Sequence, residues 1–267
     1  MYKLIVTDLD ETLLNDDKHV SKADIETISK LTDCKLVIAT GRGFEAVQAS
    51  LKEIGQYNMP NQYLISFNGG VITECKDNKI LYSKLMPFED VKMLFNIGLK
   101  YDVCIHIYTL DCCYAYRLFE NERNILIGGS FALNTFEDTS LEFFKDKKIA
   151  KVLFCKEDMD YLRMIKKQIN LDDRFSISFS SNRYLEINPL GIDKGVGLKK
   201  LCKLLDIDIK DTIAVGDNLN DLSMIKVAGL GIGVKNSLDD IKDDLDVLLD
   251  YTNNEDPLTH IVEKYVK

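Results

Sequence analysis

The chain has 267 residues, enough for one large domain or two modest ones. Hydrophobic residues make up 46% and charged residues 29%, which is ordinary for a globular protein with a sizeable core. The net charge of −9 argues against nonspecific binding to nucleic acid or to anionic membranes, so we expect neither as a partner. An acidic chain that acts on an anionic substrate needs local positive charge, which a bound cation or a well-placed Lys or Arg can supply.

The first predicted element is a fully buried parallel strand over Lys3–Thr7, which leads directly into Asp8-Leu9-Asp10. Such a strand carries both acids to its carboxyl end, where open α/β sheets bind their ligands. A hard cation can neutralise one of the two carboxylates while the other moves protons. The pair therefore predicts an enzyme.

Other apolar runs have the same form, because they end in a polar or glycine residue. The strands predicted from such runs are 35–39 before Thr40-Gly41-Arg42, 63–67 before Asn68-Gly69-Gly70, 212–215 before Gly216-Asp217-Asn218, and further runs at 230–234 and 246–249. Helical patterns fall between them, from a capping-box-like start at Ser21-x-x-Asp24, over 44–55 and over 194–205. This alternation predicts a doubly wound, mostly parallel sheet.

The stretch of about 85–186 has a different texture, because its strands run in hairpin-like pairs. Pro87 is placed like a proline in the first turn of a helix. The strand-like runs that follow are 104–108, 114–118, 151–155, 175–179 and 184–187, with a helix near 158–169. We predict a separate α+β domain inserted into the first one.

The predicted fold class is therefore α/β, with a Rossmann-like parallel sheet core and one inserted domain. The core is formed by residues 1–84 and 187–267, and the insertion by residues 85–186. The return into the core, Asn188-Pro189-Leu190-Gly191, is predicted to be a hinge or turn because of its Pro and Gly.

The seven cysteines form no Cys-x-x-Cys pair, and no His lies at zinc-ligand spacing from them. We interpret them as buried structural thiols, which is typical of a reducing cytoplasm. No signal-like segment precedes the first strand, and no apolar run approaches the length of about 18 residues needed to span a bilayer. We expect a cytoplasmic protein that does not use a membrane.

Reactive residue types stand at the ends of separate predicted elements. They are Asp8 and Asp10, then Thr40, then Lys194 at the start of a helix, and then Asp217, Asn220 and Asp221. In this order they resemble the first to fourth motifs of the haloacid dehalogenase phosphatase superfamily. The long interval between the second and third motifs resembles the subgroup with a large α/β cap, the Cof-type phosphatases, and the resemblance covers essentially the whole chain.

The resemblance implies a chemistry for the acidic residues. A Mg²⁺ ion would be held by the Asp8 side chain, the Asp10 backbone carbonyl and Asp217, and would screen the dianionic phosphate from its attacker. Asp8 would attack phosphorus and form an aspartyl-phosphate intermediate. Asp10 would protonate the leaving alkoxide and then deprotonate water.

The resemblance also implies a phosphate-binding set. Thr40, the Gly41 backbone amide and the Asn220 amide would donate hydrogen bonds to phosphoryl oxygens. Lys194 would neutralise charge in the transition state, and Asp221 would orient Lys194 or a metal-bound water.

Each of these residues has a structural alternative when it is taken alone. The two acids of the first motif could be turn or cap residues, Thr40 a helix N-cap, Lys194 a solvated surface residue, and Asp217 a cap for the next helix. Asn68 could contact the ligand or only form a turn. Arg42 could lie near the phosphate or on the surface.

Two further features bear on function. Glu11 stands where the resembled family usually has Gly, so it must adopt costly backbone angles, and we expect its side chain to point to solvent. No His stands beside a candidate Ser or Cys nucleophile, so we do not expect a hydrolase triad, and His106 is interpreted as a packed or surface residue.

The leading hypothesis is a Mg²⁺-dependent phosphohydrolase that cleaves small phosphorylated metabolites such as sugar phosphates, with the inserted cap closing over the organic part. We expect a monomer or weak homo-oligomer. One alternative is a phosphotransferase such as a sugar-phosphate mutase, and another is a low-turnover protein that binds a phosphorylated ligand, which only Glu11 favours.

Overall fold

The first strand lies inside its sheet, with a parallel neighbour on each side. In the computed structural model, which describes residues 1–127, 132–171 and 173–266, β1 (Leu4–Thr7) is buried at every position. It pairs in parallel with β2 (Lys35–Ala39) and with β12 (Thr212–Gly216). A strand that is buried on both faces has no polar face, so its sequence lacks the alternation of a half-buried strand.

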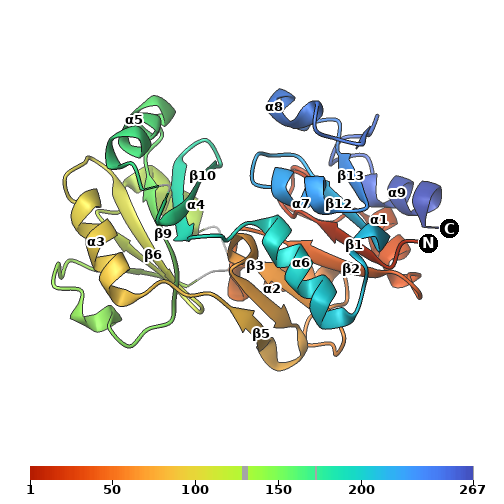
Figure 1. Ribbon diagram of the computed structural model, residues 1–267, viewed down its shortest axis with the longest axis horizontal. Coiled ribbons are helices and arrows are strands. Elements are labelled where there is room, and N and C mark those ends of the chain that lie inside the picture. The colour runs from red at the N-terminus through yellow and green to blue at the C-terminus, as the bar shows by residue number, and fades with distance from the viewer. Residues whose placement is uncertain (128–131, 172, 267) are drawn as a thin grey trace. The chain divides into compact units, whose positions relative to one another are not determined.

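Within the described residues, this sheet has eight strands in the order β14-β13-β12-β1-β2-β3-β4-β5 (Figure 1). The other strands are β3 (Tyr63–Ser66), β4 (Val71–Glu74), β5 (Lys79–Ser83), β13 (Leu230–Gly233) and β14 (Val247–Leu248). The pairs from β14 through to β3 are parallel, whereas β4 and β5 run antiparallel at one edge. The predicted α/β class with a mostly parallel sheet is confirmed.

Helix α6 (Lys194–Leu205) has the bounds that the sequence pattern predicts. Its apolar face buries Leu198 and Leu201 in the same core as Val6 of β1. Helix α2 (Phe44–Glu53) ends two residues before the predicted 55. The remaining helices of this part of the chain are α1 (Lys22–Ser29), α7 (Leu222–Val227), α8 (Asp239–Lys242) and α9 (Pro257–Tyr265).

The capping box predicted at the start of α1 is only half formed. The Ser21 hydroxyl accepts the Asp24 backbone N–H at 3.1 Å, as an N-cap should. The Asp24 carboxylate does not complete a reciprocal bond with Ser21. It accepts the backbone N–H and the hydroxyl of Thr259 in α9, each at 2.8 Å, and so ties the first helix to the last.

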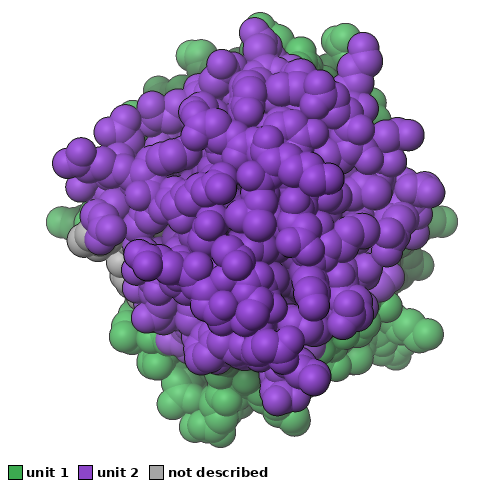
Figure 2. Space-filling view, turned by 90° about the vertical axis from the view of Figure 1, so that its left-hand side faces the viewer, with its two compact units in different colours: residues 1–42, 47–83, 193–267 green, residues 43–46, 84–192 purple. Residues whose placement is uncertain are grey.

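The chain divides into two compact units, which Figure 2 shows in green and purple. Unit 1 consists of residues 1–42, 47–83 and 193–267, and unit 2 of residues 43–46 and 84–192. The sheet built around β1 lies in unit 1. The assignment of residues 85–186 as a cap stays a prediction.

Unit 2 has its own sheet, with six strands among the described residues in the order β10-β11-β9-β6-β7-β8. Its pairs are antiparallel apart from β7 with β8. The strands are β6 (Cys104–Thr109), β7 (Cys113–Tyr116), β8 (Leu133–Thr135), β9 (Ile149–Cys155), β10 (Phe175–Ser180) and β11 (Tyr184–Pro189). The helices are α3 (Phe88–Gly98), α4 (Glu120–Ile127) and α5 (Met159–Ile169). Side chains of α3 and α5 form one core with β9, which includes Phe95, Ile165 and Phe154.

Two local predictions in this region are wrong. Pro87 is the N-cap of α3 and lies just before the first helical turn. Asn188 and Pro189 continue β11, paired with Ser176 and Phe175 of β10, so the turn begins only at Leu190. Strand pairing here outweighs the turn preference of the two residues.

All seven cysteines are free and buried. Burial raises the pKa of the Cys34 thiol to about 11 and that of Cys75 to about 12, which keeps both in the unreactive thiol form at neutral pH. The prediction of structural thiols is confirmed. Across the described ranges, we find no helix with the length and apolar character that crossing a membrane requires.

Candidate active site

The carboxyl ends of three adjacent strands gather the predicted site residues. Asp8 follows β1, Thr40 follows β2 and Asp217 follows β12, and these strands are parallel neighbours. The ends of parallel neighbours lie at the same edge of a sheet, so the three side chains meet there although the chain separates them. The backbone N–H of Asp8 still bonds to Val215 of β12, at 2.9 Å, which fixes the first acid against the third strand.

Lys194 is buried at the centre of the acidic residues. Its ammonium group donates to Asp8 Oδ1 at 2.5 Å and to Asp221 Oδ1 at 2.6 Å, and its side chain is fully shielded from solvent. Burial lowers the pKa of Lys194, but the charges of Asp221 and Asp8 outweigh it, so the net pKa is raised and the lysine stays charged. The alternative of a solvated surface lysine is wrong.

Lys194 is placed by the start of α6. The N-cap Asp193 accepts the backbone N–H of Val196 at 2.7 Å, so the helix begins at the lysine itself. The first residue of a helix cannot bond its own N–H within the helix, and its side chain projects at the end of the element. The N-cap therefore fixes where α6 begins, and with it the position of the Lys194 ammonium group.

Asp221 uses both carboxylate oxygens within the protein. Oδ1 accepts from Lys194, and Oδ2 accepts the backbone N–H groups of Asp217 and Asn218, each at 3.0 Å. Asp221 therefore fixes both the lysine and the loop that carries Asp217. Of the two roles that the sequence left open, this geometry favours orienting Lys194.

Asp8, Asp217 and Asp221 are buried, and one oxygen of each lies within 4.8 Å of the others. One Asp8 oxygen accepts from the Lys194 ammonium group, and Asp217 Oδ1 accepts from the Thr12 hydroxyl at 2.6 Å. Within the part of the chain that the structure describes, no donor bonds to the second oxygen of Asp8 or of Asp217. Oxygen ligands of this kind suit a hard divalent cation, so the residues fit such an ion.

The protonation of the cluster points the same way. Burial raises the pKa of Asp8 well above its usual range, although Lys194 opposes this. Burial, helped by the charge of Asp221, raises the pKa of Asp217 to about 7. Both shifts reflect mainly the cost of burying a carboxylate charge, to which the neighbouring acids add, and a bound cation would offset that cost.

The second motif forms a tight loop beside this cluster. The Thr40 side chain is buried, and its hydroxyl oxygen accepts the backbone N–H of Arg42 at 3.1 Å. A hydroxyl that accepts in this way keeps its own hydrogen for a further acceptor. Helix α2 begins only at Phe44, so the alternative of Thr40 as a helix N-cap is wrong, and its bond within the loop leaves the predicted donation to a phosphoryl oxygen possible.

Arg42 has a partner that the sequence did not indicate. Its guanidinium group holds the Asp10 carboxylate by two bonds, Nε to Oδ2 at 2.9 Å and Nη2 to Oδ1 at 2.5 Å. The guanidinium group is therefore not an isolated surface charge, and its place near the phosphate stays a prediction. The sequence signal was only the position of Arg42 directly after Thr40-Gly41, which says nothing about Asp10.

Asn220 and Glu11 complete the neighbourhood. The Asn220 amide nitrogen donates to Asn68 Oδ1 at 3.4 Å, so the fourth motif meets the turn after β3. Glu11 has a φ of 59°, the left-handed conformation that a family glycine would adopt freely, and its side chain is exposed as expected. Its backbone carbonyl accepts the Asn236 amide at 2.8 Å, which holds the turn in place.

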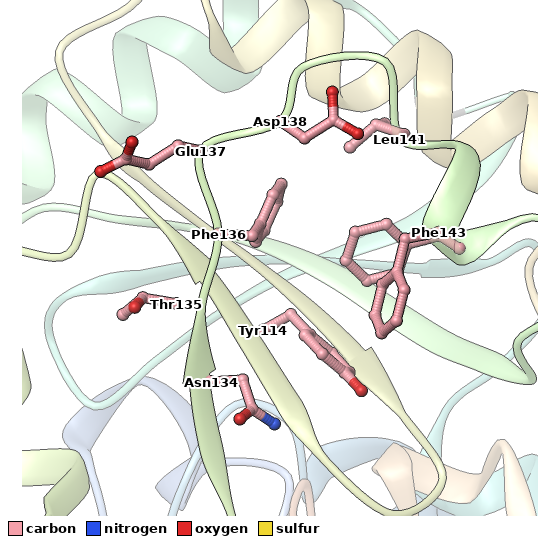
Figure 3. A pocket seen from close by; sticks show the side chains of 9 residues that line it. Tyr114, Asn134, Thr135, Phe136, Glu137, Asp138, Leu141 and Phe143 are labelled. Carbon is pink, nitrogen blue, oxygen red and sulfur yellow. The ribbon is translucent and has the colours of Figure 1, made fainter.

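A separate cavity of about 420 Å³ lies within unit 2 (Figure 3). Aromatic side chains line it, and the rings of Tyr114 and Phe144 meet edge to face with centroids 5.1 Å apart. None of the residues that line it belongs to the predicted site. His106 is also in unit 2 and fully buried, which confirms that it is a packed residue.

The sequence matches the family of haloacid dehalogenase-like hydrolases over residues 5–262. The chain belongs to this family. The predicted family, the fold class and the status of the chain as an enzyme are confirmed.

Two relatives that are named for a particular phosphatase activity are similar to this hydrolase over most of their length. The 5-amino-6-(5-phospho-D-ribitylamino)uracil phosphatase of Bacillus subtilis is 28% identical, over 99% of this chain and 96% of its own. The HMP-PP phosphatase of Yersinia pseudotuberculosis is 28% identical, over 92% of this chain and 88% of its own. A crystal structure of a haloacid dehalogenase-like hydrolase from Bacteroides thetaiotaomicron has a TM-score of 0.84 and 27% identity, and covers 99% of both chains.

Proposed function

We propose that this hydrolase is a Mg²⁺-dependent phosphatase of small phosphorylated metabolites that uses Asp8 as its nucleophile. The observation that carries the proposal is the buried cluster of Asp8 and Asp217 next to the ion pair of Lys194, in which each acid retains one oxygen to which no donor among the described residues bonds. A nucleophilic carboxylate needs such an unshared oxygen, and its burial beside a charged lysine prepares the site for an anion.

The ion would be held by the side chains of Asp8 and Asp217 and by the Asp10 backbone carbonyl. When bound, it supplies positive charge that screens the attacking carboxylate from the phosphate dianion. Asp221 is not assigned as a ligand, because both of its oxygens accept protein hydrogen bonds.

The protein groups divide the remaining work. An Asp8 oxygen forms a bond to phosphorus while the bond from phosphorus to the leaving oxygen breaks. Lys194, the Thr40 hydroxyl, the Gly41 amide and the Asn220 amide stabilise the charge that builds on the phosphoryl oxygens. These groups belong to loops after the parallel strands or, for Lys194, to the start of α6, and these elements hold them in a fixed arrangement.

Asp10 is assigned the proton transfers. It gives its proton to the leaving alkoxide in the first step, and takes one from water as that water attacks the aspartyl-phosphate. Phosphate then leaves and Asp8 is restored. Both Asp10 oxygens accept from Arg42, so one of them must take up a proton before the first step, and the fork fixes the direction in which the carboxyl group points.

The substrate class draws support from the named relatives. The Bacillus subtilis relative is named for a phosphorylated ribitylaminouracil, and the Yersinia relative for HMP-PP. Both support a small phosphorylated metabolite as the substrate. In this proposal the inserted residues 85–186 act as the cap that selects the organic part and excludes water.

Phosphate release from a panel of phosphorylated metabolites and an aryl phosphate, with Mg²⁺ and after chelation, tests the proposal. We expect turnover only with the metal, and its loss in Asp8→Asn with the fold retained. Asp24→Asn is the matched control, because Asp24 is also a buried acid of unit 1 but belongs to α1 and bonds to Thr259 of α9, not to any predicted site residue. Metal-independent turnover, or normal turnover in Asp8→Asn, would refute the proposal.

The same assay separates the alternatives. A sugar-phosphate mutase would return an isomerised sugar phosphate without net release of phosphate. A low-turnover binding protein would release almost none, but Glu11, the feature that favoured this alternative, directs its side chain to solvent.

A further inference from the structure

The turn after β3 has an unusual backbone. Phe67, Asn68 and Gly69 follow one another with φ values of 50°, 53° and 93°, all in the left-handed region. Asn enters this region more easily than other residues with a side chain, but a bulky Phe does so only where its surroundings hold it. The turn is therefore held by contacts on more than one side.

One of these contacts is with the loop of the second motif. The Asn68 backbone N–H donates to the Thr40 carbonyl at 3.0 Å, and the Phe67 N–H donates to the Arg42 carbonyl at 3.1 Å. These two carbonyls flank Gly41, where an added Cβ would lie 3.2 Å from Asn68 Oδ1. The turn thus holds the predicted phosphate-binding loop by two backbone hydrogen bonds, which do not depend on the Asn68 side chain.

A second contact is with the start of α6. A Cβ on Gly69 would lie 2.2 Å from the backbone oxygen of Asp193, the N-cap of that helix. Only a glycine allows the turn to approach the point from which Lys194 projects. The turn therefore touches the elements that carry the second and third motifs.

The Asn68 side chain reaches the fourth motif. It is 4% exposed, and its Oδ1 accepts the Asn220 amide nitrogen at 3.4 Å. A primary amide carries two hydrogens, so Asn220 can give one to Asn68 and the other to a ligand. A fixed acceptor for the first hydrogen also fixes the direction of the second.

We propose that Asn68 is a positioning residue, which holds the Asn220 amide in the orientation that donates to the phosphoryl group. The inference rests on the proposed phosphatase function and adds to it a residue outside the four motifs. Asn68 acts through Asn220 and needs no contact with substrate. The backbone role of Asn68 in the turn can be separated from the role of its side chain toward Asn220, because Gly adopts the same left-handed backbone conformation but has no side chain.

The test is a double-variant cycle with Asn68→Gly and Asn220→Ala. We expect Asn68→Gly to lower kcat/KM about tenfold and to weaken inhibition by vanadate, a phosphoryl mimic, by a similar factor. In the Asn220→Ala background the same change should have almost no further effect, because the amide that it positions is absent. The control is Asn61→Gly, which also changes a left-handed Asn (φ 60°) but lies on the surface and should leave both quantities unchanged.

Two results would overturn the inference. If Asn68→Gly were as active as the wild type, Asn68 would serve the turn alone. If the two losses multiplied in the double variant, Asn68 would act on the ligand independently of Asn220. Should Asn68→Gly fail to fold, Asn68→Ala also removes the acceptor oxygen, and its cycle with Asn220→Ala must show the same non-additivity. A wild type without phosphate release would refute the proposed function instead, so the two failures are distinct.

Discussion

Replacing Asp221 with Asn probes the ion pair at the centre of the site. Asp221 is fully buried, and its two oxygens accept three hydrogen bonds, one from Lys194 and two from backbone N–H groups. An Asn amide has one oxygen, so its nitrogen would face either the ammonium group or the two backbone donors. Removing one partner of a buried pair costs about 3–5 kcal/mol. Against a total stability of about 5–15 kcal/mol, this is a large fraction.

Urea unfolding of the metal-free protein measures this loss, with chelator present because a bound ion would add stability of its own. Circular dichroism is a suitable signal, since the chain contains no Trp. Asp211→Asn is the control, because Asp211 pairs with Lys3 at 2.7 Å on the surface and should leave the midpoint nearly unchanged. The double variant Lys194→Met with Asp221→Asn should lose less than the sum of the single losses. A wild-type midpoint in Asp221→Asn would refute the view that Asp221 stabilises the lysine and the loop.

Three further changes test other parts of the molecule. Arg42→Ala removes both bonds that hold the Asp10 carboxylate, so turnover of an alkyl phosphate should fall about tenfold. Turnover of an aryl phosphate should fall less, because a good leaving group needs less help from the general acid. Equal losses would show that Arg42 does not act through Asp10. Burial, with the charge of Lys151, lowers the pKa of His106 to about 3 in the folded protein. The unfolded chain therefore binds a proton at His106 at a higher pH than the folded protein does, so the free energy of unfolding falls as the pH drops below about 6.5, by up to about 1.4 kcal/mol per pH unit. Urea midpoints at pH 7 and pH 5.5 should therefore differ less in His106→Gln than in the wild type, and an equal difference contradicts the assignment. Glu11→Gly should leave phosphate release unchanged or raise it, because the left-handed angle is then free of strain, and a loss of more than about tenfold would show a role for Glu11.

The residues that could be placed from sequence are those that directly follow a strand. Asp8, Thr40 and Asp217 each stand after an apolar run, and parallel pairing then brings them to one edge without further information. The partner of Asp10 was not predicted, because Arg42 is 32 residues away in the chain, and Lys194 was named as a partner of Asp221, 27 residues away, only through the family resemblance. Which side chain meets which across two loops depends on their final packing, and no local periodicity records it.

The fold shows the same division between local pattern and tertiary context. Helix α6 has its predicted bounds because an N-cap Asp and a regular apolar face specify it locally. The end of β11 was predicted as a turn because Asn188-Pro189 favours one in isolation. In the folded chain these residues pair with β10, and the sheet's contacts decide the conformation.

The charges of the site account for the kind of ion it should select. Asp8, Asp217 and Asp221 are buried around Lys194, so three carboxylates face one ammonium group. Asp221 is satisfied by the lysine and by backbone donors, which leaves the excess on the two acids that keep an unshared oxygen. Buried charge without a partner is costly, and the raised pKa values of Asp8 and Asp217 express that cost. An excess of two negative charges is offset by one divalent cation, whereas a monovalent ion would leave half of it in place, so a divalent ion with oxygen ligands is the partner that this cluster favours.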